Sequence, residues 1–225
     1  MRRLFLSLLL VASLPFAAGL RGAADVPKMP LLFQDDFKKG ADAWEPTDPK
    51  AWKVSDGKDA KVFSQFAQSK YKPPHRSPLN IALVKDLAVG DFVLDARVQS
   101  TARDYPHRDV CLFFGYQDPA HFYYVHLGRK TDDHANQIFI VNQADRKKIS
   151  TQTTDGTPWD DGWHHVRIVR TVGDGTILVY FDDMKAPVMT ATDKTFTWGR
   201  VGVGSFDDTA NWTDIQLHGV KAEKK

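Results

Sequence analysis

The sequence predicts an all-β protein, a two-sheet antiparallel jelly-roll sandwich, and two observations support that prediction. Short apolar runs recur along the chain with turn residues between them, which is the pattern of sandwich strands. The acidic residues are almost all aspartate, because only Glu45 and Glu223 among 28 acids are glutamate. Aspartate favours turns and caps, whereas glutamate favours helix interiors. A chain with so little glutamate is expected to have few surface helices.

The expected strands follow one another at hairpin spacing. Side chains alternate faces along a strand, so Phe92, Leu94, Ala96 and Val98 are expected to face the core. The segment YKPPHRSP interrupts the pattern, because proline cannot donate within a sheet ladder. Residues 172–175, VGDG, form a hairpin turn. Strands are expected over residues 31–37, 63–68, 80–84, 92–99, 110–115, 121–128, 137–142, 163–171, 176–182, 200–205 and 212–220, with a loop leading into a short strand over 44–54.

The first 24 residues have the order of a secretory signal peptide. Arg2 and Arg3 precede the apolar run at residues 4–14, and small residues follow up to Ala24, the expected cleavage site; Gly19 is the alternative. The run is shorter than the roughly 20 residues that span a bilayer as a helix. No later segment is apolar enough for a span, so no stable membrane span is expected after cleavage. Residues 25–225 are expected to be a single domain of a secreted or periplasmic protein.

Charge and cysteine content narrow the classes of partner. Removal of Arg2, Arg3 and Arg21 leaves 27 Lys and Arg against 28 Asp and Glu. A near-neutral chain without basic runs argues against nucleic acid as a partner. Cys111 is the only cysteine, so no internal disulfide can form, and its apolar surroundings predict an inert core thiol.

Three segments carry a resemblance to a known superfamily. They are the opening LFQDDF, the segment WHHVRIVRTVGDGTILVYFDD and the segment GRVGVGSFDDTANWTDIQL. Together they resemble the concanavalin A-like lectin/glucanase and laminin-G-like superfamily, and most closely the secreted 3-keto-disaccharide hydrolase-like domains. The resemblance covers roughly residues 31–220, nearly the whole mature chain. It implies the jelly-roll fold, whereas the chemistry stays open because this superfamily includes lectins, glycosidases, lyases and adhesion modules.

A glycoside hydrolase needs two carboxylates that flank the scissile bond. In the glucanases of this superfamily, the carboxylates lie on one strand in the motif Glu-x-Asp-x-x-Glu. This chain has no such motif. Asp95 and Asp109 are the candidates that remain on expected strands. A glucanase of the usual kind is therefore disfavoured, and a pair of aspartates is the glycosidase alternative that stays open.

A polysaccharide lyase needs a proton-transferring side chain and a group that neutralises a uronate carboxylate. In the expected strand HFYYVHLG, Tyr124 and His126 share one face and are the candidate catalytic pair, because His and Tyr serve as general acids and bases. If the other face is core, both project from the concave sheet. The candidate substrate-binding residues around them are Arg76, Arg97, Asp109, His134, Asn136 and Gln137.

Sugar binding without turnover requires the same kinds of side chain. Flat aromatic rings pack on the apolar faces of sugar rings, and planar polar groups bind the hydroxyl edges. The sequence therefore predicts a module that binds or processes an extracellular polysaccharide or oligosaccharide through its concave sheet. The alternative is a non-catalytic structural or adhesion module that binds protein, which a flat apolar patch would favour over a polar groove.

No required cofactor is expected. Many sandwich domains that resemble this chain carry a structural calcium ion between the first and last strands. Asp36 in LFQDDF and Asp214 in WTDIQL are the matching positions, and calcium prefers such oxygen ligands. Aspartates are also common in ordinary turns. His164 and His165 do not predict zinc, because neighbouring strand residues face opposite sides.

Overall fold

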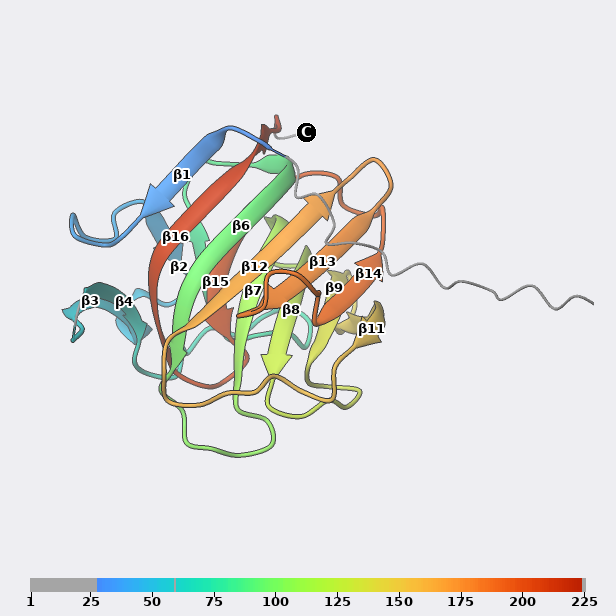
Figure 1. Ribbon diagram of the computed structural model, residues 1–225. Helices are drawn as coiled ribbons and strands as arrows, with labels where there is room; N and C mark the ends of the chain where they lie inside the picture. Colours follow the sequence, from blue (N-terminus) through green and yellow to red (C-terminus); the bar gives the residue numbers. More distant parts are fainter. Residues whose placement is uncertain (1–27, 59, 224–225) are drawn as a thin grey trace, which may run out of the picture.

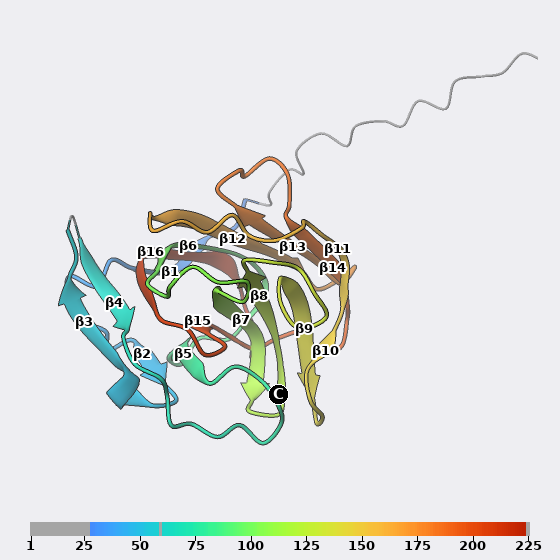
Figure 2. The same cartoon turned by 90° about the horizontal axis from the view of Figure 1, so that it is seen from below.

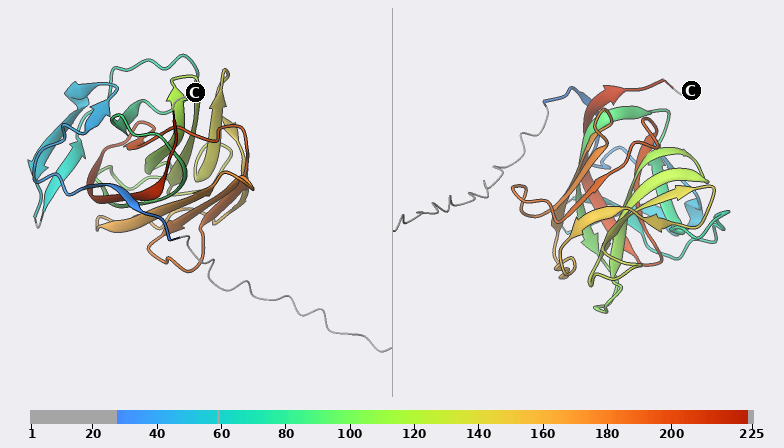
Figure 3. Two further views of the ribbon diagram at one scale, coloured as in Figure 1. Left: turned by 90° about the horizontal axis from the view of Figure 1, so that it is seen from above. Right: turned by 90° about the vertical axis from the view of Figure 1, so that its right-hand side faces the viewer.

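A computed structural model describes residues 28–58 and 60–223 of the chain. The predicted signal peptide lies outside these residues. Two antiparallel sheets pack face to face as a sandwich (Figures 1 and 3). Among the described residues the only helical element is the short 3-10 turn η1 (Pro49–Ala51). The predicted all-β jelly-roll sandwich is confirmed.

Sheet A, the nine-stranded sheet, has the order β11-β14-β13-β12-β6-β16-β4-β3, and β1 also pairs with β16. All of its pairings are antiparallel. Its strands are β1 (Leu31–Asp35), β3 (Trp52–Asp56), β4 (Lys61–Gln65), β6 (Val89–Ser100), β11 (Ser150–Thr153), β12 (His164–Thr171), β13 (Thr176–Phe181), β14 (Met189–Thr192) and β16 (Ala210–Lys221).

Sheet B, the seven-stranded sheet, has the order β10-β9-β8-β7-β15-β5-β2. Its pairings are antiparallel as well. Its strands are β2 (Trp44–Pro46), β5 (Asn80–Val84), β7 (Asp109–Asp118), β8 (His121–Gly128), β9 (Gln137–Asn142), β10 (Lys147–Lys148) and β15 (Arg200–Ser205).

The main hydrophobic core lies between the two sheets, where strand alternation predicts it. Phe92, Leu94, Ala96 and Val98 of β6 all face this core, as expected. On β8, alternate residues from Tyr123 to Leu127 face it too. The intervening β8 side chains therefore leave the core on the outer face of sheet B. Within the described residues, no helix has the length and apolar character needed to cross a membrane.

Three short strands lack the sequence signal of a strand. β10, β11 and β14 were not expected, because they are polar or only two to four residues long. β10 and β11 lie at sheet edges, where one side of the ladder is free and no apolar alternation is needed. Their existence depends on the neighbouring strands that they pair with rather than on their own sequence.

The outer face of sheet B is largely apolar and is not an open concave surface. Phe113, Phe122, Tyr124 and Phe139 form part of a second buried cluster there. Residues 66–79, between β4 and β5, run below this face, as Figure 2 shows, and Tyr71 from this segment packs on the cluster. The predicted sugar-binding face is therefore partly covered.

Candidate functional site

A pocket of about 240 Å³ lies at one end of the outer face of sheet B. It gathers side chains from β8 and from five connecting segments. Its residues are two arginines, three histidines, two aromatic residues and one aspartate: Arg76, Arg146, His107, His126, His134, Tyr105, Phe206 and Asp207. Three of them, Arg76, His126 and His134, were predicted as site residues.

Arg146 forms a fixed cationic wall of the pocket. Its guanidinium carbon lies 4.2 Å from the ring centroid of Phe206 and 4.9 Å from that of Phe139. Its Nη1 donates to the hydroxyl of Tyr124 at 3.0 Å. A guanidinium has five N–H donors, so this arginine holds a set orientation and keeps donors for a ligand.

Arg76 is brought to the pocket by the segment that crosses sheet B. Its backbone N–H donates to Asp145 Oδ1 at 2.9 Å, and its carbonyl accepts from the Arg146 N–H at 3.1 Å. These bonds fasten the segment to the turn between β9 and β10. The Arg76 residue itself is exposed beside the pocket. This arginine is therefore positioned by a proline-rich segment and two backbone hydrogen bonds rather than by a strand.

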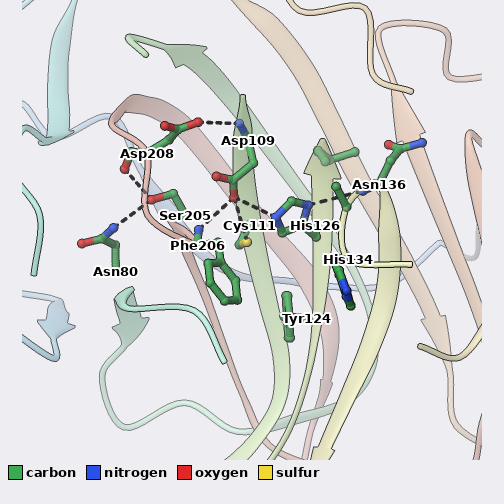
Figure 4. Close-up of polar contacts among 12 residues, drawn as sticks. Asn80, Asp109, Cys111, Tyr124, His126, His134, Asn136, Ser205, Phe206 and Asp208 are labelled. Carbon is green, nitrogen blue, oxygen red and sulfur yellow. Dashed lines mark hydrogen bonds and ion pairs between the residues drawn. The ribbon is translucent and has the colours of Figure 1, made fainter. Parts of the chain in front are cut away.

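His126 lies at the floor of the pocket and is only 4% exposed. Its Nδ1 accepts the backbone N–H of Asn136 at 3.3 Å. A neutral imidazole has one donor and one acceptor nitrogen, so Nε2 carries the proton and faces Asp109 Oδ2, 3.4 Å away. Burial, with added repulsion from Arg146 and His107, lowers the pKa of His126 to about 3. The imidazole is therefore neutral, and both of its nitrogens have partners (Figure 4).

Asp109 lies beneath His126 and is fully buried. Its Oδ2 accepts the Phe206 N–H at 2.8 Å and the Cys111 thiol at 3.4 Å, whereas its Oδ1 has no hydrogen-bond partner. Burial, together with the charges of Asp208 and Asp207, raises the pKa of Asp109 well above its usual value. The Cys111 thiol is buried as predicted, and burial raises its pKa as well.

Tyr124 leaves the core on the predicted side of β8 but is fully buried under the second cluster. Its ring stacks on Phe139, with centroids 5.1 Å apart. Burial raises the pKa of Tyr124 well above 10, despite the nearby Arg146. A general base needs a pKa near the working pH and access to the substrate, so this geometry favours a supporting role for Tyr124. Its predicted catalytic role with His126 stays a prediction.

The loop before β9 forms the other side of the pocket. Asp132 Oδ1 accepts the backbone N–H of His134 at 2.6 Å, and Asp132 Oδ2 lies 3.3 Å from His107 Nε2. The side-chain amide of Gln137 donates to the Asp132 carbonyl at 2.9 Å. The Asn136 side chain is buried and joins this loop to the segment after β11, through Thr131 on one side and Thr154 and Thr157 on the other. Of the predicted polar residues here, His134 reaches the pocket, while Gln137 and Asn136 support the loop.

Arg97 does not join this group, contrary to expectation. It lies on β6 in sheet A, 3.8 Å from Asp214 and beside the ring of Trp163. The alternation of side chains along β6 shows which face of the strand each residue is on, but it does not show which sheet the strand joins. The structure therefore separates the predicted arginines, with Arg76 at the pocket and Arg97 on the opposite sheet.

The predicted calcium ligands share a cavity of about 430 Å³ at the β1 end of sheet A. Asp36 is paired with Lys38 at 2.7 Å, and Asp214 lies near Arg97. Both side chains are about half exposed. Because each carboxylate already has a cationic neighbour, these residues do not fit a calcium ion well, and calcium at this position stays a prediction.

Five pocket residues were not predicted from the sequence: Tyr105, His107, Arg146, Phe206 and Asp207. They come from loops, where strand alternation carries no information. The motif SFDD, two adjacent carboxylates directly after an expected strand, is the one signal that could have identified the Phe206–Asp208 turn. Only the chain path brings these loops to one end of sheet B.

Comparisons with known proteins show the fold. No family model matches the sequence, and no curated protein matches it significantly. A carbohydrate-binding module from Bacillus subtilis is 16% identical with a TM-score of 0.56, over 79% of this chain and 96% of that chain. A putative glycosyl hydrolase from Parabacteroides distasonis is 13% identical with a TM-score of 0.52, over 84% and 100% of the two chains.

A plant lectin has the same architecture. Lectin I from Ulex europaeus, solved with the methyl glycoside of α-L-fucose, is 10% identical with a TM-score of 0.55, over 84% of this chain and 97% of the lectin. At such identities the similarity is one of fold. The chain therefore has a jelly-roll sandwich fold, which it shares with a carbohydrate-binding module and a lectin.

Proposed function

We propose that this protein binds carbohydrate in the pocket at the end of sheet B. The observation that carries the proposal is the concentration of two arginines, three histidines and two aromatic residues around one 240 Å³ pocket. Sugar hydroxyls need convergent donors and acceptors, and sugar ring faces need aromatic surface. The similarity in fold to a carbohydrate-binding module and a lectin supports the same reading.

The pocket favours the end of a glycan chain over its interior. Its volume is below the roughly 300–1,000 Å³ of pockets for drug-sized ligands. Tyr71 of segment 66–79 packs on the buried aromatic cluster of the outer face, so that part of the face is not open to a glycan chain. We therefore expect one sugar residue to enter the pocket while the remainder of the glycan stays in solvent.

The charge of the pocket favours an acidic sugar. Arg76 and Arg146 are both on its wall, and the one carboxylate in its lining is Asp207, with Asp109 and Asp208 behind it. Arginine binds carboxylates through two parallel N–H donors, and Arg146 is already oriented by Phe139 and Phe206. A uronate-containing oligosaccharide is accordingly the preferred ligand class.

Binding is favoured over turnover by the state of the two candidate catalytic groups. Both nitrogens of His126 have partners, and the Tyr124 hydroxyl is buried with a raised pKa. Hydrolysis or elimination remains the second candidate, because it uses the same sugar-binding pocket. The predicted secretion signal fits either function, since both act on extracellular glycans.

The direct test compares two arginine variants on a panel of neutral and uronate-containing oligosaccharides. Binding is measured by isothermal titration calorimetry for Arg76→Ala and for Arg97→Ala. Both arginines are exposed, but Arg76 lies at the pocket beside sheet B, whereas Arg97 lies on β6 in sheet A. We expect Arg76→Ala to weaken uronate binding by about tenfold, equivalent to the roughly 1.4 kcal/mol of one charge-assisted hydrogen bond, and Arg97→Ala to bind normally.

Loss of binding in Arg97→Ala alone would place the site on sheet A and contradict the proposal. Mass spectrometry of the same mixtures distinguishes the enzymatic alternatives. Products with added water indicate a hydrolase, and unsaturated ends indicate a lyase. Failure to bind any glycan of the panel would favour the protein-binding adhesion module.

The structure gives the adhesion module little surface. Among the described residues, the exposed large apolar side chains are Leu31, Phe66 and Val220. Protein-binding faces usually present contiguous apolar patches of several hundred Å². Phe66 also lies under the ammonium of Lys53, 4.6 Å from its ring centroid.

A further inference from the structure

The buried carboxylate of Asp109 has one oxygen without a partner. Oδ2 receives the Phe206 N–H and the Cys111 thiol, but Oδ1 has no hydrogen-bond partner and is shielded from solvent. Figure 4 shows Oδ2 on the side of Cys111 and His126, and Oδ1 toward the turn that carries Ser205 and Asp208. Buried polar atoms are nearly always paired, so this oxygen requires an explanation.

Oδ1 of Asp109 makes no hydrogen bond. An ionised carboxylate in this position leaves a buried negative oxygen unpaired, which is costly in a protein interior. A cation bound to Oδ1 would satisfy the group in its ionised form.

Two further carboxylates converge on the same place. Oxygens of Asp109, Asp207 and Asp208 lie within 4.8 Å of one another. Ca²⁺ binds oxygens at about 2.3–2.6 Å, so two of its ligands are at most about 5 Å apart. One ion can therefore contact all three residues. Among the described residues, no lysine or arginine lies within ion-pair distance of these three carboxylates, and the histidine beside them is His126, whose Nε2 lies 3.4 Å from Asp109 Oδ2.

The turn that carries Asp207 and Asp208 is held in place independently of any ion. Asp208 Oδ2 accepts the Asp109 N–H at 2.8 Å, and Asp208 Oδ1 accepts the Tyr105 hydroxyl at 2.9 Å. Ser205 donates to the Asp208 carbonyl at 2.5 Å. Each carboxylate oxygen has a second lone pair, so these bonds orient Asp208 and leave it able to bind a cation.

A zinc site made of Asp109, Cys111 and His126 is the competing arrangement, since these three also lie close together. The tautomer of His126 argues against it. The Asn136 N–H can only donate, so it occupies the lone pair of Nδ1 and leaves the proton on Nε2, the nitrogen that faces Asp109. A protonated nitrogen cannot bind a metal. The oxygen set therefore fits a cation better than the mixed set does.

We propose that Asp109, Asp207 and Asp208 bind a hard divalent cation, Ca²⁺ in the first instance, at the floor of the pocket. Three carboxylates supply part of the six to eight oxygens that Ca²⁺ takes. Asp207 lines the pocket, so the remaining positions open toward water or a ligand. The site stands independently of carbohydrate binding and is distinct from the position between Asp36 and Asp214.

Thermal unfolding of chelator-treated protein tests the site without any glycan. The probes are CaCl₂, MgCl₂, MnCl₂ and ZnCl₂, with CaCl₂ titrated by calorimetry. At 100 times its dissociation constant, Ca²⁺ is expected to raise Tm by roughly 5–10 °C. Asp207→Asn, an exposed position that should fold normally, is expected to weaken Ca²⁺ binding at least tenfold. Asp109→Asn is expected to remove the shift.

The matched control is Asp36→Asn, which alters the other acidic cavity and should keep the full shift. No shift with Ca²⁺, Mg²⁺ or Mn²⁺ would overturn the proposal. A shift with Zn²⁺ alone, lost in Cys111→Ser, would overturn it in favour of the mixed site. Loss of the shift in Asp36→Asn with retention in Asp207→Asn would place the ion at the β1 end of sheet A instead.

Discussion

The backbone N–H of Asn136 donates to Nδ1 of His126 at 3.3 Å, and this bond determines the tautomer of the histidine at the pocket floor. Asn136 can make it because its φ is +53°, in the left-handed region that asparagine tolerates better than most residues. A residue in a loop thus decides what the only pocket histidine on a strand can do.

Replacement of Asn136 should destabilise the fold. Its amide donates to Thr131 Oγ1 and the Thr154 carbonyl, and its Oδ1 accepts from Thr157. Asn136→Ala leaves these buried groups unpaired, which costs about 1–3 kcal/mol for each group, and it places an alanine in the left-handed backbone region. We expect the free energy of unfolding, measured with urea, to fall by about 3 kcal/mol. Asn142→Ala, at the exposed end of β9, is the control, and an equal loss there would contradict the explanation.

Tyr124→Phe separates a catalytic from a supporting role. The change removes the acceptor for Arg146 Nη1 but keeps the ring that stacks on Phe139. We expect glycan affinity to fall only a few-fold, because Arg146 keeps its contacts with both aromatic rings. If the chain proves to cleave its glycan, complete loss of turnover with unchanged binding would instead assign Tyr124 a catalytic role.

Arg146→Lys should weaken uronate binding although it conserves the positive charge. A lysine ammonium cannot reproduce the planar stacking between Phe139 and Phe206 or a two-point contact with a carboxylate. Uronate binding is expected to weaken about tenfold in calorimetry, with neutral sugars affected less. Equal weakening for neutral and acidic ligands would show that the arginine shapes the pocket and does not recognise charge.

The ion-pair cluster on sheet A should make stability depend on pH in the acid range. Asp95 Oδ1 lies 2.6 Å from His165 and 2.8 Å from Arg167. Burial raises the pKa of Asp95, but hydrogen bonds from these two residues outweigh burial and hold it below 3.8. When folding lowers the pKa of a carboxyl group, the ionised group stabilises the fold at pH values above its pKa in the unfolded chain. This stabilisation is lost as the pH falls through its pKa in the folded protein.

Asp95→Asn should therefore be less stable than the wild type at pH 7, and the difference should narrow below pH 4. Urea unfolding at pH 7 and pH 3 measures it, with the exposed Asp155→Asn as control. A difference that stays constant between the two pH values would show that packing, not charge, accounts for the role of Asp95.

Gly204 is required for the close approach of β15 to β5. A Cβ at this position would lie 1.8 Å from the Asn80 carbonyl oxygen. Gly204→Ala is expected to lower the free energy of unfolding by more than about 3 kcal/mol, because the backbone of a paired strand would have to move. At Gly173 a Cβ meets nothing within 4 Å, so Gly173→Ala should be neutral or slightly stabilising in thermal unfolding. Equal stability of the two variants would contradict this explanation.

The fold could be predicted because strand patterns are local. The alternation from His121 to Leu127 showed which side chains leave the core, and Tyr124 and His126 do leave it. Polar edge strands such as β11 carry no such signal, because they pair without burying a face. Arg76 was a candidate from its residue type, whereas Arg146 was not, since nothing near it in sequence distinguishes it from other loop residues.

By itself, the sequence determined the class of fold, the inward face of β6 and the inert setting of the single cysteine. Only the tertiary structure decided that Arg97 belongs to sheet A, that residues 66–79 cover the outer face of sheet B, and that Asp109 meets Asp207 and Asp208. The physical reason is that alternation follows from the geometry of one strand. Sheet membership and loop position depend on hydrogen bonds between segments about a hundred residues apart or more, such as that of the Asp109 N–H with Asp208.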